Sequence, residues 1–367
     1  MNIKNILHRS DYTKLYLVIA SGLVLALATA PALANDKDKR NGKARAGETR
    51  FVSPTVKCSA PDSEDQDDMC IWVHPSDAAL STVICSDKKA GRIFVYDLAG
   101  KLIQSIAARK PGNIDVRYRF PLGGQSVDIV AFNQRSDPRI VVYKLDSRTR
   151  QLERADNGAI RTCKNYGGTL YRSPKTGRFH FVVTSEQGEI EQYELADDGS
   201  GKVAGKKVRN WRIGTAEGAV ADDETGKIYI GEENRGVWEV GGEPDDPTPG
   251  TRVIELGQNG LAADVEGLAI YHLPGGAGYL LVSNQGGNNF KVYDRVTHAF
   301  VGTFAVEGAK ETDGIDVCNA SLGPLFPKGL FACHTAKGKC PVLLVPWDTV
   351  AKAVPQLKLD TAWSRRR

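Results

Sequence analysis

One recurring motif constrains the fold of this chain more than any other feature of its sequence. A carboxylate, often followed by Gly, precedes apolar residues at Asp68-Met-Cys-Ile-Trp72, Asp128-Ile-Val-Ala131, Glu217-Gly-Ala-Val220, Glu266-Gly-Leu-Ala269 and Asp313-Gly-Ile-Asp316. Tyr166-Gly-Gly-Thr-Leu170 fits the same pattern with a phenol in place of the acid. The copies recur roughly every 49 residues, which is the length of one four-stranded propeller blade. The repeat predicts an all-β, six-bladed β-propeller whose four-stranded antiparallel blades surround a central channel.

Short alternating segments support this interpretation. Each holds an aromatic residue, then a polar residue, then a turn, and they span residues 92–98, 139–145, 190–195 and 290–295. Such alternation is typical of half-buried strands, and helical periodicity is scarce. A pair of β-sandwiches would also contain many short strands, but it does not explain the regular period.

The N-terminus has the pattern of a targeting segment. Lys4, Arg9 and Lys14 precede the apolar run 15–30, and the small residues Ala32 and Ala34 match a signal-peptidase site. We therefore predict a signal peptide over 1–34, a flexible charged linker over 35–50 and a propeller domain over 51–367. An uncleaved membrane anchor is the alternative. Cleavage after Ala34 predicts a secreted or periplasmic protein with no membrane attachment.

Charge and cysteine content narrow the function classes. Basic residues are concentrated at the two ends of the chain, so the body between them is net negative, which disfavours a nucleic-acid partner. Seven cysteines in an exported chain predict some disulfides, and the preferred pairs are Cys70–Cys85 and Cys333–Cys340, although spacing leaves the connectivity open. No cysteine is followed five residues later by Arg, so a phosphatase-type thiol nucleophile is not expected.

The repeat also predicts where the acids lie. In a propeller the innermost strands begin at one mouth of the channel, so Asp68, Asp128, Glu217, Glu266 and Asp313 should converge there, with Asp67, Glu233, Asp264 and Asp316 close by. Crowded carboxylates repel one another and raise each other's pKa. Ca²⁺ relieves that repulsion and prefers clustered oxygen ligands. The alternative is that the acids cap turns or pair with Lys and Arg.

With these residues placed, the chain resembles the β-propeller phytase, or alkaline phytase, family from about Phe51 to Val350. The stretches that carry the resemblance are 67–75, 87–91, 113–118, 186–195, 217–223, 229–233, 264–267, 283–286 and 311–317. The resemblance implies a calcium-dependent phosphoric monoester hydrolase of the 3-phytase type. Such an enzyme releases phosphate from myo-inositol hexakisphosphate (phytate) with a metal-activated water, and a second phosphate site adds affinity.

The resemblance also assigns roles to individual residues. The calcium ligands it implies are Asp67, Asp68, Glu217, Glu233, Asp264, Glu266 and Asp313. Glu217, Glu233, Asp264 and Glu266 form the implied catalytic set, and Lys88, Arg135 and Tyr166 the implied phosphate-binding set. Local sequence allows a hairpin turn at Lys88, a surface position for Arg135 and a core position for Tyr166. The expected partner is phytate or another phosphorylated small molecule, bound as its calcium complex by a monomer.

Three segments depart from the family pattern. Glu186-Gln187 stands where the family usually has Lys-Glu, which removes a cation from a phosphate site. Cys333-His334-Thr335 begins the segment that replaces Gln-Asp-Gly, and His74, expected to cap a turn, replaces an acidic or amide residue. The rival functions are a calcium-dependent lactonase-like propeller, which needs fewer acids and no phosphate-binding cations, and a non-catalytic interaction propeller.

Overall fold

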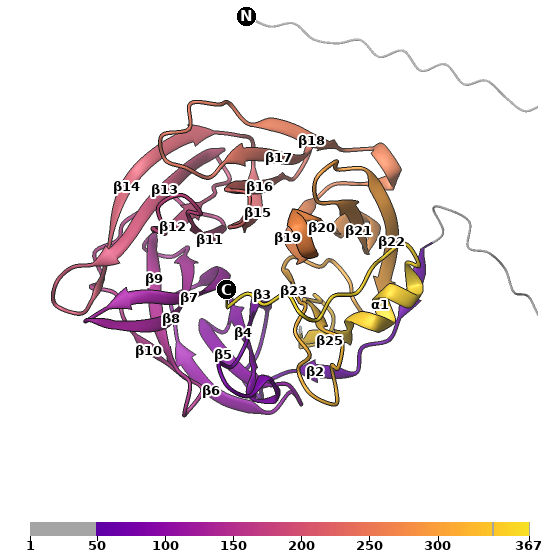
Figure 1. Cartoon of the computed structure of the whole chain (residues 1–367), viewed down its shortest axis with the longest axis horizontal. Helices are drawn as coiled ribbons and strands as arrows, with labels where there is room; N and C mark the ends of the chain where they lie inside the picture. The colour runs from indigo at the N-terminus through magenta and orange to yellow at the C-terminus, as the bar shows by residue number, and fades with distance from the viewer. Residues whose placement is uncertain (1–48, 340, 367) are drawn as a thin grey trace, which may run out of the picture. The chain divides into compact units, whose positions relative to one another are not determined.

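The computed structural model describes residues 49–339 and 341–366. Six sheets surround a central channel (Figure 1). The innermost strand of each sheet contacts the innermost strand of the next, and the sixth contacts the first, so the ring is closed. The predicted six-bladed propeller is therefore confirmed.

The strands of each of the first three blades follow one another along the chain, from the channel outward. Blade 1 consists of β3 (Gln66–Trp72), β4 (Thr82–Asp87), β5 (Arg92–Asp97) and β6 (Leu102–Ala107). Blade 2 consists of β7 (Pro111–Leu122), β8 (Gln125–Gln134), β9 (Arg139–Asp146) and β10 (Gln151–Arg154). Blade 3 consists of β11 (Gly168–Arg172), β12 (Phe179–Val183), β13 (Glu189–Asp197) and β14 (Val203–Arg212).

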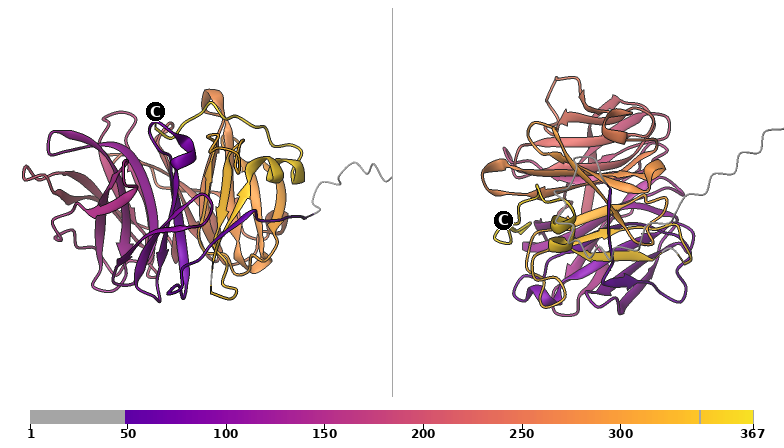
Figure 2. Two further views of the ribbon diagram at one scale, coloured as in Figure 1. Left: turned by 90° about the horizontal axis from the view of Figure 1, so that it is seen from below. Right: turned by 90° about the vertical axis from the view of Figure 1, so that its right-hand side faces the viewer.

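Blade 4 also consists of consecutive strands, whereas blades 5 and 6 each add a strand from the N-terminal end of the described chain. Blade 4 consists of β15 (Ala216–Asp222), β16 (Lys227–Glu232), β17 (Gly236–Gly241) and β18 (Thr251–Glu255). Blade 5 consists of β19 (Val265–His272), β20 (Gly278–Asn284), β21 (Asn289–Asp294), β22 (Phe300–Val306) and β1 (Arg50–Val52), which pairs in parallel with β22. Blade 6 consists of β23 (Ile315–Cys318), β24 (Leu330–Cys333), β25 (Val342–Pro346) and β2 (Val56–Cys58). Figure 2 shows the blades from two further directions.

Few helices accompany the sheets. The one α-helix among the described residues is α1 (Trp347–Ala353), and the 3₁₀ turns are η1 (Ala78–Leu80), η2 (Gln258–Gly260), η3 (Pro274–Gly276) and η4 (Gln285–Gly287). None of the helices in the described ranges is long and apolar enough to cross a lipid bilayer. The predicted signal peptide lies outside the described residues, as does the predicted linker up to Glu48. Arg50, the last residue of that linker, begins β1.

The four alternating segments are strands, as predicted. They correspond to β5, β9, β13 and β21, each the third strand of its blade. Their apolar side chains pack between neighbouring blades: Phe94 and Tyr96 of β5 face blade 6, whereas Ile93 and Val95 face blade 2. Successive side chains of a strand point to opposite faces of its sheet, so each of these strands contributes to two interfaces between blades.

The Gly of the recurring motif allows the innermost strands to approach one another closely. A Cβ at Gly218 would lie 2.1 Å from the Glu266 carbonyl oxygen, and one at Gly267 would lie 2.4 Å from that of Asp313. The Gly267 N–H donates to the same Asp313 oxygen at 2.8 Å. Each of these motif glycines therefore packs against the backbone of the next acid, which brings successive carboxylates together.

One acid of the predicted ring has a different place. Asp128 lies in β8, the second strand of blade 2, and not at the start of the innermost strand β7. The register of the strand pairs puts Gly112, near the start of β7, at the position that Glu217 and Glu266 hold in blades 4 and 5. In sequence Gly112 lies near the midpoint between Asp67 and Tyr166, whereas Asp128 lies well past it. The acid-first pattern was therefore misleading in this blade, because no carboxylate stands at the matching position.

The preferred disulfide between Cys70 and Cys85 is wrong. Both thiols are free and buried, and Cys70 pairs with Ile84 across the β3–β4 ladder while Met69 pairs with Cys85. The offset of one residue directs the two side chains to opposite faces of blade 1, where Cys70 packs toward blade 2 and Cys85 toward blade 6. The other preferred pair includes Cys340, which lies outside the described residues.

The residues that follow α1 cross the end of the channel where the innermost strands finish (Figure 1). The Arg365 guanidinium donates to Asp316 of β23 at 2.8 Å, and that of Arg366 donates to Asp128 at 3.2 Å. The Trp363 indole donates to Glu224 at 2.8 Å and stacks on His272 of β19. These contacts close one side of an internal cavity of about 300 Å³. We call this end the tail mouth and the opposite end the site mouth.

We expect Gly218→Ala to destabilise the propeller, because the new methyl group would overlap the backbone of blade 5. Overpacking of this kind costs roughly 1–3 kcal/mol or more of unfolding free energy, and it should also displace Glu217 and lower activity. Gly199→Ala is the comparison, since no atom outside its chain neighbours lies within 4 Å of its Cβ position and only its positive φ costs stability, by roughly 1–2 kcal/mol. Chemical denaturation measures both free energies of unfolding, and an unchanged stability of Gly218→Ala would contradict the packing argument.

Candidate functional site

Six carboxylates gather at the site mouth, where the innermost strands begin. We call them the acid cluster, and they are Asp67, Glu217, Glu233, Asp264, Glu266 and Asp313. Glu217, Glu233 and Glu266 each offer a carboxylate oxygen within 4.8 Å of the others. Glu217 and Glu266 lie near the starts of β15 and β19, and Glu233 follows the end of β16. The predicted convergence is observed for these residues.

The remaining three acids adjoin this trio. Asp67 and Asp313 come from blades 1 and 6, and both interact electrostatically with Glu217. Asp264 precedes β19 and interacts with Glu233 and Glu266. Contributions from blades 1, 4, 5 and 6 therefore meet in one place, although the residues are far apart in the sequence.

Three groups of the predicted phosphate-binding set lie among these acids. The Lys88 ammonium, in the β4–β5 turn, is 2.6 Å from Asp67 Oδ1 and 3.1 Å from Asp313 Oδ2. The Arg135 guanidinium lies 3.6 Å from Glu217 Oε1 and 4.2 Å from the centre of the Tyr166 ring. The Tyr166 hydroxyl interacts with Glu217 and Glu233. The site mouth thus combines a carboxylate cluster with two cations and a phenol.

The electrostatics of the cluster indicate an excess of negative charge. Burial, reinforced by neighbouring carboxylates, raises the pKa of Glu217 and of Glu266 well above the usual range. Burial also raises the pKa of Asp67 to about 6, although Lys88 opposes the shift. Burial and Asp264 raise the pKa of Glu233. Two cations are too few to neutralise six carboxylates, so the cluster favours protonation or binding of a further cation.

Unpartnered oxygen atoms identify where such a cation fits. Asp67 Oδ2, Glu233 Oε1 and Glu266 Oε2 are buried and have no hydrogen-bond partner among the described residues. Buried carboxylate oxygens are costly without a partner. An all-oxygen donor set of this kind matches the preference of Ca²⁺. The residues present therefore fit a hard divalent cation.

Two of the predicted acids lie deeper in the channel or at the tail mouth. Asp68 follows the cluster member Asp67 in β3. Its side chain accepts a hydrogen bond from the Ile114 N–H at 3.0 Å and lines the internal cavity. Asp316 accepts from the Ile71 N–H at 2.8 Å and pairs with Arg365. For Asp316, as for Asp128, the alternative of pairing with arginine is what the structure shows.

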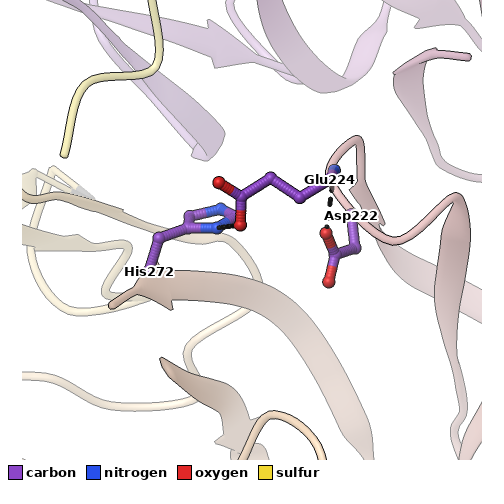
Figure 3. A group of neighbouring side chains, drawn as sticks. All are labelled: Asp222, Glu224 and His272. Carbon is purple, nitrogen blue, oxygen red and sulfur yellow. Dashed lines mark hydrogen bonds and ion pairs between the residues drawn. The ribbon is translucent and has the colours of Figure 1, made fainter. Parts of the chain in front are cut away.

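A second group of possible metal ligands lies at the tail mouth (Figure 3). It consists of Asp222, Glu224 and His272, from the far ends of β15 and β19. The buried Arg295 guanidinium donates to Asp222 at 2.7 Å and to Glu224 at 2.8 Å, so both carboxylates already have a cationic partner. Burial lowers the pKa of His272 to about 4. We interpret this group as an ion-pair network that supports the tail, in contrast to the acid cluster.

The departures from the family pattern also have definite places. Glu186 is 46% exposed at the edge of the site, 3.6 Å from Arg135 and 3.3 Å from Lys164. His334 is buried, and its Nδ1 accepts from the Asp313 N–H at 3.0 Å, which holds the loop that carries Asp313. His74 Nδ1 accepts from the Asp77 N–H at 3.0 Å, so this residue caps a turn as expected.

Sequence reasoning missed two polar contributors to the site. The Gln285 side-chain amide donates to Asp313 Oδ1 at 2.6 Å and orients that carboxylate. Lys164 adds a cation beside Glu186. The segment 283–286 supported the family resemblance without a role for Gln285, whereas nothing in the repeat pattern pointed to Lys164, because it lies in a loop before β11.

Comparisons with known proteins identify the family of this chain and proteins that share its fold. The phytase family profile matches residues 14–355. The chain is 42% identical over 282 residues to the 3-phytase of Bacillus subtilis (strain 168), covering 73% of this chain and 74% of the relative. The fold is also shared with a luciferin-regenerating enzyme (TM-score 0.51, 15% identity, 80% of this chain and 95% of that chain). It is likewise shared with the calcium-binding protein regucalcin of Agrobacterium tumefaciens (TM-score 0.52, 13% identity, 85% and 94%).

The fold and the site together define a six-bladed propeller with an acidic, cation-containing mouth. Within that class, the match over most of the chain decides the family: the chain belongs to the phytase family and is a phytase hydrolase. The two structural similarities have low identity and show the fold alone. The lactonase-like and non-catalytic alternatives are therefore set aside.

We expect the repulsion within the acid cluster to make metal-free stability depend on pH. Because burial raises the pKa of Asp67 to about 6 and those of Glu217 and Glu266 well above their usual range, the folded state binds protons more tightly than the unfolded chain. The free energy of unfolding should then fall as pH rises from about 4 through these raised values. In chelator at pH 7, Glu217→Gln should raise the Tm by about 2 °C per kcal/mol of relieved repulsion.

The gain should shrink as the pH is lowered from 7 to 5, because the raised pKa of Glu217 favours the neutral form of the wild-type carboxyl. Glu153→Gln is the matched control, because that exposed acid pairs with Lys144 on the outer edge of blade 2, away from the cluster. Thermal melts in chelator at both pH values measure the effect. Identical melting of wild type and Glu217→Gln at pH 7 would show that the cluster carries no excess charge.

Proposed function

We propose that this phytase hydrolyses phosphate monoesters of phytate in a calcium-dependent reaction at the site mouth. One observation supports the proposal most. Glu217, Glu233 and Glu266 each offer a carboxylate oxygen within 4.8 Å of the others, and two cations, Arg135 and Lys88, lie beside the same cluster. Carboxylates alone suit a metal, and cations alone suit a phosphate. Their presence in one mouth suits a metal-assisted reaction on a phosphorylated substrate.

Calcium would be held by the acid cluster, with Glu217, Glu233, Asp264 and Glu266 at its centre and Asp67 and Asp313 at the side of blades 1 and 6. When bound, calcium supplies positive charge that offsets the substrate phosphates and lowers the pKa of water. Asp68, which faces the cavity beneath the cluster, would act as a ligand from below. These assignments retain the ligand set that the sequence resemblance implies.

The protein's own cations would bind and orient the phosphate. The Arg135 guanidinium is 13% exposed and is held against the Tyr166 ring, so its planar donors are already oriented. A guanidinium fork matches the geometry of a phosphate oxygen pair. Hydrolysis forms a bond between a water oxygen and phosphorus and breaks the bond between phosphorus and the inositol oxygen. A carboxylate of the acid cluster would take the water proton and return it to the departing inositol oxygen, which leaves as the alcohol.

We propose further that the protein is exported, as the predicted signal peptide over 1–34 indicates, and that it acts as a monomer. An extracellular or periplasmic location would expose the site to environmental calcium and to phytate. Phytate is so highly charged that it would arrive as a calcium complex.

Addition of Ca²⁺ should raise both activity and Tm. A ligand that binds only the folded state stabilises it by about 2.7 kcal/mol at 100 times its Kd. Phosphate release from phytate and thermal melts, each with Ca²⁺ or with chelator, measure the two effects. Glu217→Gln should reduce both responses, whereas Glu153→Gln should keep them. If neither the Tm nor the activity changes on addition of calcium or of chelator, the proposed calcium dependence is wrong.

Glu186 should weaken substrate binding, because its carboxylate lies 3.6 Å from Arg135 and competes with phosphate for it. We expect Glu186→Gln to lower the KM for phytate about threefold to fivefold, since an exposed ion pair is worth roughly 1 kcal/mol or less. Glu186→Lys should lower it further, with a smaller change in kcat and with a dependence on salt.

Arg135→Met should have the opposite effect and raise the KM. Glu194→Gln is the matched control, because this acid lies farther along β13 and pairs with Arg178 on the outer surface. Steady-state kinetics measure the KM and kcat of these variants for phytate. If Glu186→Lys left KM unchanged while Arg135→Met raised it, Glu186 would have no influence on the bound phosphate.

A further inference from the structure

Lys88 occupies a position that is unusual for a residue expected to bind substrate. It does not come from an innermost strand but from the turn between β4 and β5. Its ammonium lies 2.6 Å from Asp67 Oδ1, 3.1 Å from Asp313 Oδ2 and 4.0 Å from Asp65 Oδ2. The three N–H donors of the ammonium therefore face three carboxylates, two of them members of the acid cluster.

These contacts leave the ammonium engaged with the same oxygens that a metal would need. Asp67 has one oxygen bound to Lys88 and the other without a partner among the described residues. Asp313 has one oxygen bound to Lys88 and the other bound to Gln285. A divalent cation that approaches Asp67 and Asp313 would meet the ammonium at short range, and like charges a few ångströms apart repel.

The two cations of the site differ in their freedom to move away. Arg135 is fixed by its stack on Tyr166 and is 3.6 Å from the nearest carboxylate oxygen, so its ion pair with Glu217 is loose. Lys88 makes closer ion pairs, but its flexible four-carbon stem is 24% exposed at the mouth of the site. A lysine ammonium is a compact ion on a stem with many rotamers, so it can exchange places with a metal ion.

We propose that Lys88 is a built-in competitor for the metal: its ammonium neutralises Asp67 and Asp313 in the metal-free protein and leaves them when a divalent cation binds. This inference rests on the proposed calcium dependence. Once displaced, the ammonium is beside the metal and free to bind a substrate phosphate. Lys88 is thus a positioning residue that stabilises the metal-free protein and lowers the affinity of the acid cluster for calcium. When the metal is bound, its ammonium is available to a substrate phosphate.

Calorimetric titration with Ca²⁺ alone, without substrate, tests the competition. Lys88→Met should bind Ca²⁺ about tenfold more tightly than wild type, and its Tm in chelator should be lower because Asp67 and Asp313 lose their partner. Lys89→Met is the matched control, since Lys89 is the next residue, carries the same charge and is exposed 3.5 Å from Asp65. It should change the affinity less than twofold, which accounts for any general effect of removing one positive charge.

A second measurement uses the wild-type protein and does not depend on the folding of a variant. Acylation of lysines followed by mass spectrometry reports how freely each amine reacts. Addition of Ca²⁺ should increase the labelling of Lys88 severalfold relative to Lys89, because the displaced ammonium is no longer held by carboxylates. Sodium chloride at equal ionic strength controls for screening by salt.

The outcomes separate this inference from the function on which it rests. If wild type binds Ca²⁺ and Lys88→Met binds it equally or more weakly, Lys88 is not a competitor, and calcium dependence stands. Unchanged labelling of Lys88 in a protein that binds Ca²⁺ would exclude the competition in the same way. If no protein in the series binds Ca²⁺ and activity ignores chelator, the calcium dependence fails, and the competition fails with it.

Discussion

Close approach of the innermost strands is the constraint on which the rest of this structure depends. The Gly after a motif acid leaves no side chain between one blade and the next, so the strand starts pack against each other's backbone. Larger side chains there would push the blades apart. The same contact that closes the ring therefore crowds the carboxylates of separate blades into one cluster. Packing and chemistry are linked through a residue that has no side chain.

The carboxylates at the two ends of the channel differ in how their charge is compensated. At the tail mouth buried carboxylates have arginine partners: Asp222 pairs with Arg295, Asp316 with Arg365 and Asp128 with Arg366. At the site mouth, six carboxylates share Lys88 and Arg135, and several oxygens have no partner among the described residues. Glu217 and Asp222 lie at opposite ends of the same strand, about 16 Å apart at 3.3 Å per residue. The tail mouth is thus charge-compensated and closed. The site mouth retains an excess of negative charge that can attract a cation.

The charge imbalance at the site mouth depends on particular residues and not on the propeller fold itself. Proteins with similar folds and low identity show that the ring of blades does not define the reaction. The chemistry lies in which residues begin the innermost strands and which cations stand beside them. Here blades 1, 4, 5 and 6 contribute acids, whereas the matching positions of blades 2 and 3 hold Gly112 and Tyr166. Arg135 stacks on Tyr166 on that side, so the mouth has an acidic half and a half suited to phosphate.

The all-β propeller, its six blades and most of the acid cluster could be predicted from the amino-acid pattern, because the repeat has a period that only a blade explains and most repeats begin with a distinctive acid. The tertiary structure alone decided that Asp128 and Asp316 pair with the tail arginines, since Arg365 and Arg366 are remote in sequence and carry no periodic signal. It also decided that Cys70 and Cys85 stay apart, because a one-residue offset in strand register directs them to opposite faces. Composition and spacing record which groups recur, but charge compensation depends on which groups meet across blades. That information is contained only in the folded arrangement.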